Sequence, residues 1–317
     1  MKVLITYPDS FLGIFIKSKL KDTFEIYDKD VNYENYEETK FFFKETLPDL
    51  VILNIPFSGG IKINIEKPAE LMTKNIIIQT NVIPCTFENK IKRLIYIGSS
   101  CMYPKIFNRS LKEEDLFSGP LEETNLAYAT SKISGWQMCK AFNNQYGTTY
   151  QTLIPANLYG EYDDFNEDTA HVIGALISRF HKAKLGGKRE VIIWGTGKPV
   201  RDFLYAEDLA DAILFSLNKN IPYDEINVGS GDGHSIKEIA ETIKEIIGYK
   251  GEIVFDTSRP DGMRMKVLST EKINKLGWKP RFSLKEGIKR TYKWYSGKGT
   301  VFQMLSKTNS TDKVTHI

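Results

Sequence analysis

The chain of 317 residues is 41% hydrophobic and 26% charged, so it can bury the core of one large α/β domain or of two smaller domains. Its 43 basic and 40 acidic residues leave a net charge of only +3, which gives no basis for nucleic acid or an anionic membrane as a partner. No apolar run reaches the roughly 18 residues of a membrane span, and the first strand begins too early to leave room for a signal peptide.

The first 160 residues alternate between strand-like and helix-like segments. Apolar runs predict buried strands at Val3–Ile5, Leu50–Pro56, Arg93–Ser100 and Tyr150–Gly160. Helical spacing predicts the helices between them at Phe11–Leu20, Glu37–Thr46, Pro68–Phe87 and Asn125–Gln145. This alternation predicts a doubly wound parallel sheet of the Rossmann type, whose ligands bind beyond the carboxyl ends of the strands.

After residue 160 the alternation loosens. A short strand is expected at Val191–Gly195, and Ser235 with Glu238 three residues later predicts a helix that opens with a capping box. Further helices are expected at Ala170–Ala183, Glu207–Leu217 and Ser283–Tyr295. The segment 296–317 is polar and lacks periodicity, which predicts a loose tail.

The three cysteines, Cys85, Cys101 and Cys139, are widely scattered and form no CxxC pair. They predict neither a disulfide framework nor a metal site, and they favour the reducing cytoplasm.

The turn after the first strand departs from the usual dinucleotide-binding pattern. Such a turn carries three glycines, which let the backbone approach a pyrophosphate at the helix N-terminus. Here only Gly13 fits, because Tyr7 and Ser10 stand at the other two glycine positions and Asp9 lies between them. The turn is therefore either no cofactor loop or an altered one.

A tyrosine four residues before a lysine gives the sharpest chemical signal. Tyr128 and Lys132 lie on one face of a predicted helix, where an ammonium would lower the tyrosine pKa. They follow a strand that ends at Ser99, and such a trio can donate a proton to a substrate oxygen. The same spacing at Tyr36 and Lys40 lacks this context, and we interpret that pair as a solvated helix face.

Several ordered stretches, reaching to about Tyr295, resemble the GDP-L-fucose synthase family, a group of extended short-chain dehydrogenase/reductases. They are Ser99–Pro104, Tyr128–Cys139, Asn144–Gly160, His171–Ala183, Trp194–Ala210, Ile226–Gly231 and Arg259–Gly262.

The resemblance implies two chemical steps in one pocket. The family epimerises C3 and C5 of GDP-4-keto-6-deoxy-D-mannose with a cysteine and a histidine, which match Cys101 and His171. Alone, these two residues would be interpreted as a small buried side chain and a helix-end residue. The family then reduces C4 with NADPH, and Ser99, Tyr128 and Lys132 match the residues of that step.

The resemblance also implies which residues bind the nucleotide sugar. These are Arg179, Trp194, Arg201, Asp261 and Lys266, of which Asp261 and Lys266 lie in a stretch that departs from the family pattern. The implied organisation is a dinucleotide-binding domain over 1–160 and a nucleotide-sugar-binding domain mainly over 161–295, with about 190–225 returning to the first. A homodimer formed through the helices at Pro68–Phe87 and Asn125–Gln145 is expected from the superfamily.

The predicted cofactor contacts leave the choice between NADPH and NADH open. A further strand is expected within Thr23–Tyr33, and Asp28 near its end favours NAD. The adjacent Lys29 could serve an NADP phosphate, and Asp30 follows. The full set of predicted contacts is Tyr7, Ser10, Phe11, Leu12, Gly13, Asp28, Lys29, Lys132, Asn157 and Leu158.

Three functions are compatible with an intact chemical site beside an eroded cofactor turn. The first is a full epimerase–reductase that makes GDP-L-fucose or a close relative, such as a product of a GDP-4-keto-heptose or a 3,6-dideoxyhexose. The second is an enzyme that has kept epimerisation alone or reduction alone. The third is a non-catalytic GDP-sugar-binding subunit, which the joint retention of Ser99, Cys101, Tyr128, Lys132 and His171 disfavours.

Overall fold

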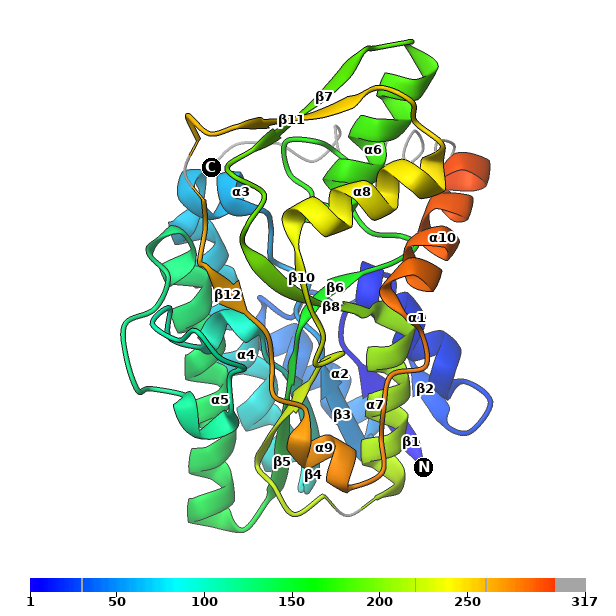
Figure 1. Cartoon of the computed structure of the whole chain (residues 1–317). Coiled ribbons are helices and arrows are strands. Elements are labelled where there is room, and N and C mark those ends of the chain that lie inside the picture. Colours follow the sequence, from blue (N-terminus) through cyan, green and yellow to red (C-terminus); the bar gives the residue numbers. More distant parts are fainter. Residues whose placement is uncertain (30, 220, 260, 300–317) are drawn as a thin grey trace.

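The structure, a computed structural model, describes residues 1–29, 31–219, 221–259 and 261–299. Asp30 and residues 300–317 of the expected tail lie outside the described residues. The main sheet has six parallel strands in the order β2-β1-β3-β4-β5-β9, which confirms the predicted doubly wound sheet (Figure 1). These strands are β1 (Lys2–Ile5), β2 (Glu25–Tyr27), β3 (Leu50–Leu53), β4 (Arg93–Ile97), β5 (Thr149–Pro155) and β9 (Glu225–Val228).

The strand order reverses between β1 and β3, and this reversal marks where such sheets bind ligands. Val3, Leu4 and Ile5 of β1 are completely buried. Burying each of these side chains stabilises the fold by about 1.5–3 kcal/mol relative to leaving it in water. The turn that follows β1 is therefore held on a rigid support.

Helices cover both faces of the sheet (Figure 1). Helices α4 and α5 pack together on one side, with α2 against α4, while α1 and α7 pack together on the other. Their bounds are α1 (Phe11–Leu20), α2 (Tyr36–Thr46), α4 (Pro68–Glu88), α5 (Leu126–Tyr146) and α7 (Ala206–Asn218). No described helix is long and apolar enough to cross a membrane.

The predicted strand Tyr150–Gly160 is divided at Ala156, and this differs from the sequence prediction. Before Ala156 the chain pairs with β4 and β9, but after it β6 (Asn157–Tyr159) pairs with β8 (Val200–Tyr205) of another sheet. In that sheet β8 also pairs with β10 (Gly233–Ser235) and β12 (Met265–Lys266). The break therefore transfers the chain from the six-stranded sheet to the sheet that carries Arg201.

A second hydrophobic core lies beside the upper ribbon of Figure 1, which pairs β7 (Glu190–Trp194) with β11 (Glu252–Asp256). Its helices are α6 (Val172–Leu185), α8 (Ile236–Ile247) and α10 (Leu284–Trp294). The predicted capping box at Ser235 and Glu238 is confirmed, because each side chain bonds the other residue's backbone N–H. The short elements are α3 (Ile61–Glu66), α9 (Glu271–Lys275), η1 (Ser100–Met102), η2 (Glu113–Asp115), η3 (Glu123–Asn125) and the π-turn η4 (Tyr295–Gly299).

Candidate active site

Ser99 and Cys101 stand at the carboxyl end of β4, where the chain turns into η1. Ser99 caps this turn, and its hydroxyl oxygen accepts the Cys101 N–H at 3.2 Å. Cys101 is half-buried, whereas Cys85 and Cys139 are buried, so among the cysteines Cys101 is the one open to a substrate. The short turn thus presents a hydroxyl and a thiol at the same edge of the sheet.

Two nitrogen donors contact the Cys101 sulfur. Asn125 Nδ2 lies 3.4 Å from Sγ, and Lys266 Nζ lies 3.5 Å from it. Lys266 is the β12 neighbour of Arg201 on β8, which brings a second cation to this edge. Burial lowers the pKa of Arg201, and the nearby Cys101 and Asp261 partly offset this effect. The sulfur therefore lies in surroundings that suit a negative charge.

Tyr128 and Lys132 occupy the first turns of α5, as the sequence predicts. Lys132 is 2% exposed, and its Nζ donates to the Ile97 carbonyl oxygen at 3.1 Å and lies 5.8 Å from the centroid of the Tyr128 ring. Burial alone lowers the pKa of Lys132 to about 7.

The pKa of Tyr128 moves in the direction opposite to the one expected from its lysine. Burial raises it, the nearby Cys101 raises it further, and a hydrogen bond with Ser99 lowers it. The reason is geometric, because Lys132 lies over the ring and bonds a backbone carbonyl. In the pair with the same spacing, Tyr36 and Lys40, the Lys40 Nζ also lies over the ring, 5.3 Å from its centroid, but Tyr36 is exposed.

His171 is the N-cap residue of α6. Its side chain is open to solvent, yet the surrounding protein desolvates the imidazolium enough to lower the pKa. The positive charge of Lys266 lowers that pKa further, and Asp164 opposes this effect. Lys266 thus acts on His171 as well as on Cys101.

Of the residues predicted to bind the nucleotide sugar, Trp194 is exposed, whereas Arg179 and Asp261 already contact other residues of the chain. Trp194 is 61% exposed, and the Arg259 guanidinium lies 5.0 Å from its ring centroid. Arg179 is engaged by the Ile192 carbonyl at 2.7 Å and by Glu167 at 3.3 Å. Both carboxylate oxygens of Asp261 accept bonds from Thr196, at 2.8 and 2.6 Å, so Asp261 also holds the turn after β7.

The turn after β1 retains a glycine-like backbone despite its substitutions. Tyr7 adopts φ +51°, a left-handed conformation that suits glycine. A Cβ on Gly13 would lie 2.2 Å from the Tyr7 carbonyl oxygen, so no larger residue fits there without moving the turn. Ser10 caps α1 by accepting the Gly13 N–H, while Phe11 and Leu12 begin the helix. The turn therefore keeps a left-handed residue at Tyr7 and a position at Gly13 that has no room for a side chain.

Two carboxylates near this turn share one lysine. Lys17 Nζ lies 2.5 Å from Asp28 and 3.7 Å from Asp9, whose side chain is 79% exposed. Asp9 therefore points to solvent and is partly neutralised, while Lys29 is exposed. Asn157 and Leu158 lie half-buried on β6, at the carboxyl end of β5.

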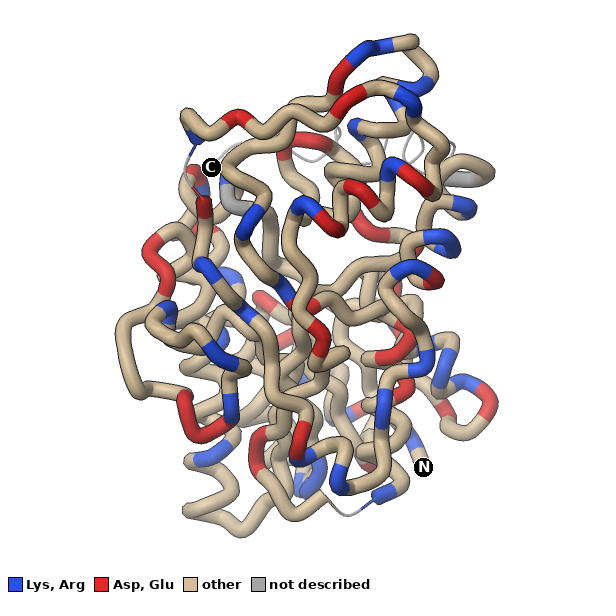
Figure 2. The backbone as a smooth tube through the Cα atoms, in the orientation of Figure 1, with Lys and Arg blue, Asp and Glu red and all other residues tan. Residues whose placement is uncertain are grey.

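Acidic and basic residues are interspersed over the part of the backbone that the structure describes (Figure 2). No group of three or more histidine, cysteine or acidic side chains within the described ranges is arranged to hold a metal ion.

The comparisons with known proteins decide the family. The model of the NAD dependent epimerase/dehydratase family matches residues 17–229. The probable GDP-L-fucose synthase 1 of Oryza sativa subsp. japonica is 43% identical over 84% of this chain and 81% of its own length. This chain belongs to that family, within its GDP-L-fucose synthase group.

Solved structures of the family agree with this assignment. A GDP-6-OMe-4-keto-L-xylo-heptose reductase from C. jejuni superposes with a TM-score of 0.87 at 34% identity, over 93% of this chain and 97% of its own. A GDP-mannoheptose C4 reductase from Campylobacter jejuni, with NADP bound, gives a TM-score of 0.84 at 36% identity, over 93% and 98%. The resemblance inferred from the motifs is confirmed.

Sequence reasoning missed Asn125 and Lys17, and it did not show the contacts that Asn54 makes. Asn54 Nδ2 donates to Ser10 Oγ at 2.9 Å and lies 3.4 Å from the Tyr7 carbonyl oxygen, so it fixes the altered turn from β3. Asn125 lies three residues before Tyr128, and that proximity was the one available signal. The contacts of Lys17 and Asn54 depend on tertiary packing and have no local signature.

Proposed function

We propose that this chain is a GDP-4-keto-6-deoxyhexose 3,5-epimerase/4-reductase that uses NADPH to make GDP-L-fucose or a close relative. One observation carries the proposal. Lys266 and Asn125 both contact the Cys101 sulfur. Cys101 is also close enough to Tyr128 to raise its pKa, and Tyr128 forms a hydrogen bond with Ser99. A group for proton exchange and a group for carbonyl protonation therefore serve one pocket.

Epimerisation is the first step. The C4 ketone acidifies the hydrogens on C3 and C5, and inversion needs an acid and a base that reach the ring from opposite sides. We assign these roles to Cys101 and His171. Whenever Cys101 has given up its proton the sulfur is a thiolate, and the contacts from Lys266 and Asn125 stabilise that negative charge.

Reduction of C4 is the second step, and bound NADPH supplies the hydride. Ser99 bonds the C4 oxygen and Tyr128 protonates it as negative charge develops there. Lys132, whose Nζ lies over the Tyr128 ring and donates to the Ile97 carbonyl, would hold the nicotinamide ribose.

The residues of the first turn fit a dinucleotide. The N–H groups of Phe11 and Leu12 at the start of α1 have no acceptor within the helix, which suits a pyrophosphate. Asp9 points to solvent and lies 3.7 Å from Lys17 Nζ, so its carboxylate opposes the phosphates less than its position in the turn suggests. NADP in a relative 36% identical supports NADPH over NADH, with Lys29 as the residue for the phosphate.

The exposed face of Trp194 and the guanidinium of Arg201 provide the main contacts to the GDP moiety. An indole ring packs against a base, and a guanidinium forms paired bonds with a diphosphate. Arg179 reaches the same region but shares its charge with Glu167, and Asp261 shapes the turn beside Trp194. Lys266 contributes to this site and to Cys101 at once.

A second candidate is a C4 reductase that acts on a GDP-4-keto-heptose. The two C. jejuni heptose reductases favour it, because they cover 93% of this chain with TM-scores of 0.87 and 0.84. The chemistry of Ser99, Tyr128 and Lys132 would be the same, and Cys101 and His171 would have no epimerisation to perform. A retained, donor-bonded Cys101 favours the first candidate.

We also propose a cytoplasmic homodimer. The three cysteines are free, which suits a reducing compartment. Helices α4 and α5 pack together along one side of the sheet and are the expected dimer surface.

The test uses the purified chain with GDP-4-keto-6-deoxy-D-mannose in D₂O, with NADPH, with NADH and without either. Deuterium should enter C3 and C5 in all three cases, and C4 should be reduced when NADPH is present. Reduction of a GDP-4-keto-heptose without deuterium in either sugar would establish the second candidate. Binding of both sugars with neither exchange nor NADPH oxidation would establish a binding subunit.

A further inference from the structure

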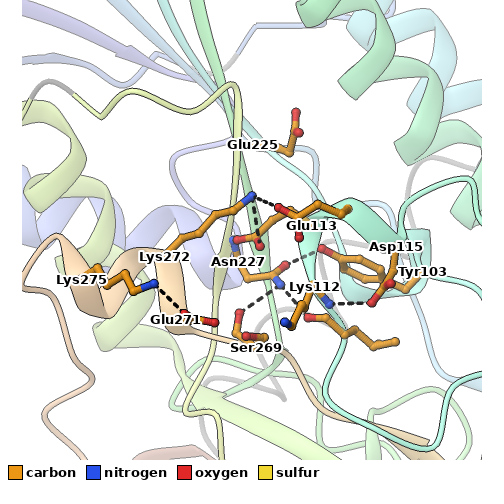
Figure 3. A network of polar contacts seen from close by, with 12 residues as sticks. Tyr103, Lys112, Glu113, Asp115, Glu225, Asn227, Ser269, Glu271, Lys272 and Lys275 are labelled. Atoms are coloured by element: carbon orange, nitrogen blue, oxygen red, sulfur yellow. Dashed lines mark hydrogen bonds and ion pairs between the residues drawn. The ribbon is translucent and has the colours of Figure 1, made fainter.

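A buried asparagine at the end of β9 joins three segments of the chain (Figure 3). Asn227 is fully buried, and its Oδ1 accepts the Tyr103 hydroxyl at 2.6 Å. Its Nδ2 donates to the Leu111 carbonyl at 2.9 Å and to the Ser269 carbonyl at 3.1 Å. Its backbone N–H donates to Glu113 at 2.9 Å. One carboxamide thus uses its oxygen and its nitrogen to hold three separate loops.

Two of these loops lead directly into the active site. Tyr103 stands two residues after Cys101, and Ser269 stands three residues after Lys266. Leu111 adds two backbone hydrogen bonds of 2.8 Å each to the segment that follows Lys266. Cys101 and Lys266 meet at 3.5 Å although 165 positions separate them in the sequence.

An ion pair holds Glu113, the carboxylate that accepts the Asn227 backbone N–H. Glu113 is 5% exposed, and Lys272 of α9 lies 3.5 Å from its second oxygen and 2.6 Å from Glu114. A buried carboxylate without a cation would be costly. Lys275, on the same short helix, contacts the exposed Glu271 at 2.6 Å and so provides a matched control (Figure 3).

Tyr128 and Lys132, to which we assign hydride transfer, are held by other contacts. Gln79 of α4 donates to the Ser131 carbonyl at 3.0 Å, next to Lys132, and Lys132 donates to Ile97. These bonds come from α4 and β4, and none involves Asn227. Tyr128 and Lys132 therefore have supports of their own that do not pass through Asn227.

We propose that Asn227, supported by Glu113 and Lys272, is a positioning residue that sets the contact between Cys101 and Lys266, and through it the rate of proton exchange at the sugar. This inference rests on the proposed function, because it needs an enzyme that exchanges protons. A displacement of about 1 Å in a proton-transfer group is enough to slow a step severely.

The experiment measures two rates on each variant. Exchange is the rate of deuterium entry into C3 and C5 of the 4-keto sugar in D₂O without NADPH. Hydride transfer is the single-turnover formation of NADPH from saturating GDP-L-fucose and NADP⁺, a direction that needs no prior exchange. The ratio of the two rates distinguishes a positioning effect from a general loss of folded protein.

Asn227→Ala should slow exchange by about tenfold or more and leave hydride transfer within about twofold of wild type. Lys272→Ala should lower the same ratio less, and Lys275→Ala should leave it unchanged. If Asn227→Ala does not fold, Tyr103→Phe performs the same test, because it removes one hydroxyl and keeps the ring.

The outcomes separate the two levels of the argument. A wild-type protein that shows no exchange overturns the proposed function. A wild-type protein that exchanges, with variants whose two rates fall in parallel or stay at wild-type values, overturns the positioning role of Asn227 alone.

Discussion

Lys132 should make the stability of this protein rise with pH in the neutral to alkaline range. The side chain is 2% exposed, and burial lowers its pKa from 10.5 to about 7. Between these two values the unfolded chain binds a proton that the folded chain does not. The free energy of unfolding therefore increases with pH, by at most about 1.4 kcal/mol per pH unit, or about 2 kcal/mol from pH 7.5 to pH 9.

Urea unfolding of wild type and Lys132→Met at pH 7.5 and at pH 9 tests this contribution. The stability of wild type relative to the variant should be about 2 kcal/mol greater at the higher pH. Tyr128→Phe is the control, since an unfolded tyrosine with a pKa near 10 is still mostly protonated at pH 9. A difference between wild type and Lys132→Met that does not change with pH would show that Lys132 is charged in the folded protein.

Two further substitutions and one control variant test the cofactor turn and the contacts to the nucleotide sugar. Gly13→Ala should weaken NADPH binding, measured by fluorescence titration, because its Cβ would lie 2.2 Å from the Tyr7 carbonyl oxygen. Gly147→Ala is the control, because Gly147 also has a left-handed φ of +65° but its added Cβ would meet no atom within 4 Å. This variant should cost about 1 kcal/mol of stability and leave NADPH binding unchanged. Trp194→Ala should raise the KM for the GDP-sugar without lowering the melting temperature, because Trp194 is 61% exposed; an unchanged KM would remove it from the site.

The sequence was sufficient to predict the type of sheet and most of its buried strands. Val3–Ile5 and Leu50–Pro56 are apolar runs whose burial follows from their composition, and the observed strands differ only at their ends. The strands β8 and β9 were not predicted. Arg201 and Asp202 interrupt the apolar pattern of β8, and β9 has only four residues, so neither has a periodicity that can be recognised.

Contacts between distant segments could not be predicted. Lys266 was assigned to the nucleotide sugar, and its approach to Cys101 depends on the pairing of β12 with β8. The direction of the Tyr128 pKa was predicted wrongly, because spacing on a helix does not show that burial outweighs a nearby ammonium. The surroundings of Asp9 could not be predicted either, since its contact with Lys17 and its exposure to solvent are not visible in the turn itself.

The central claim is that one pocket performs two chemically separate steps with different residues. The most direct measurement compares Cys101→Ser and Tyr128→Phe for deuterium entry at C3 and C5 and for single-turnover hydride transfer. Cys101→Ser should abolish exchange and retain hydride transfer from GDP-L-fucose to NADP⁺. Tyr128→Phe should retain exchange and abolish hydride transfer. Loss of both reactions in both folded variants would contradict the division of roles.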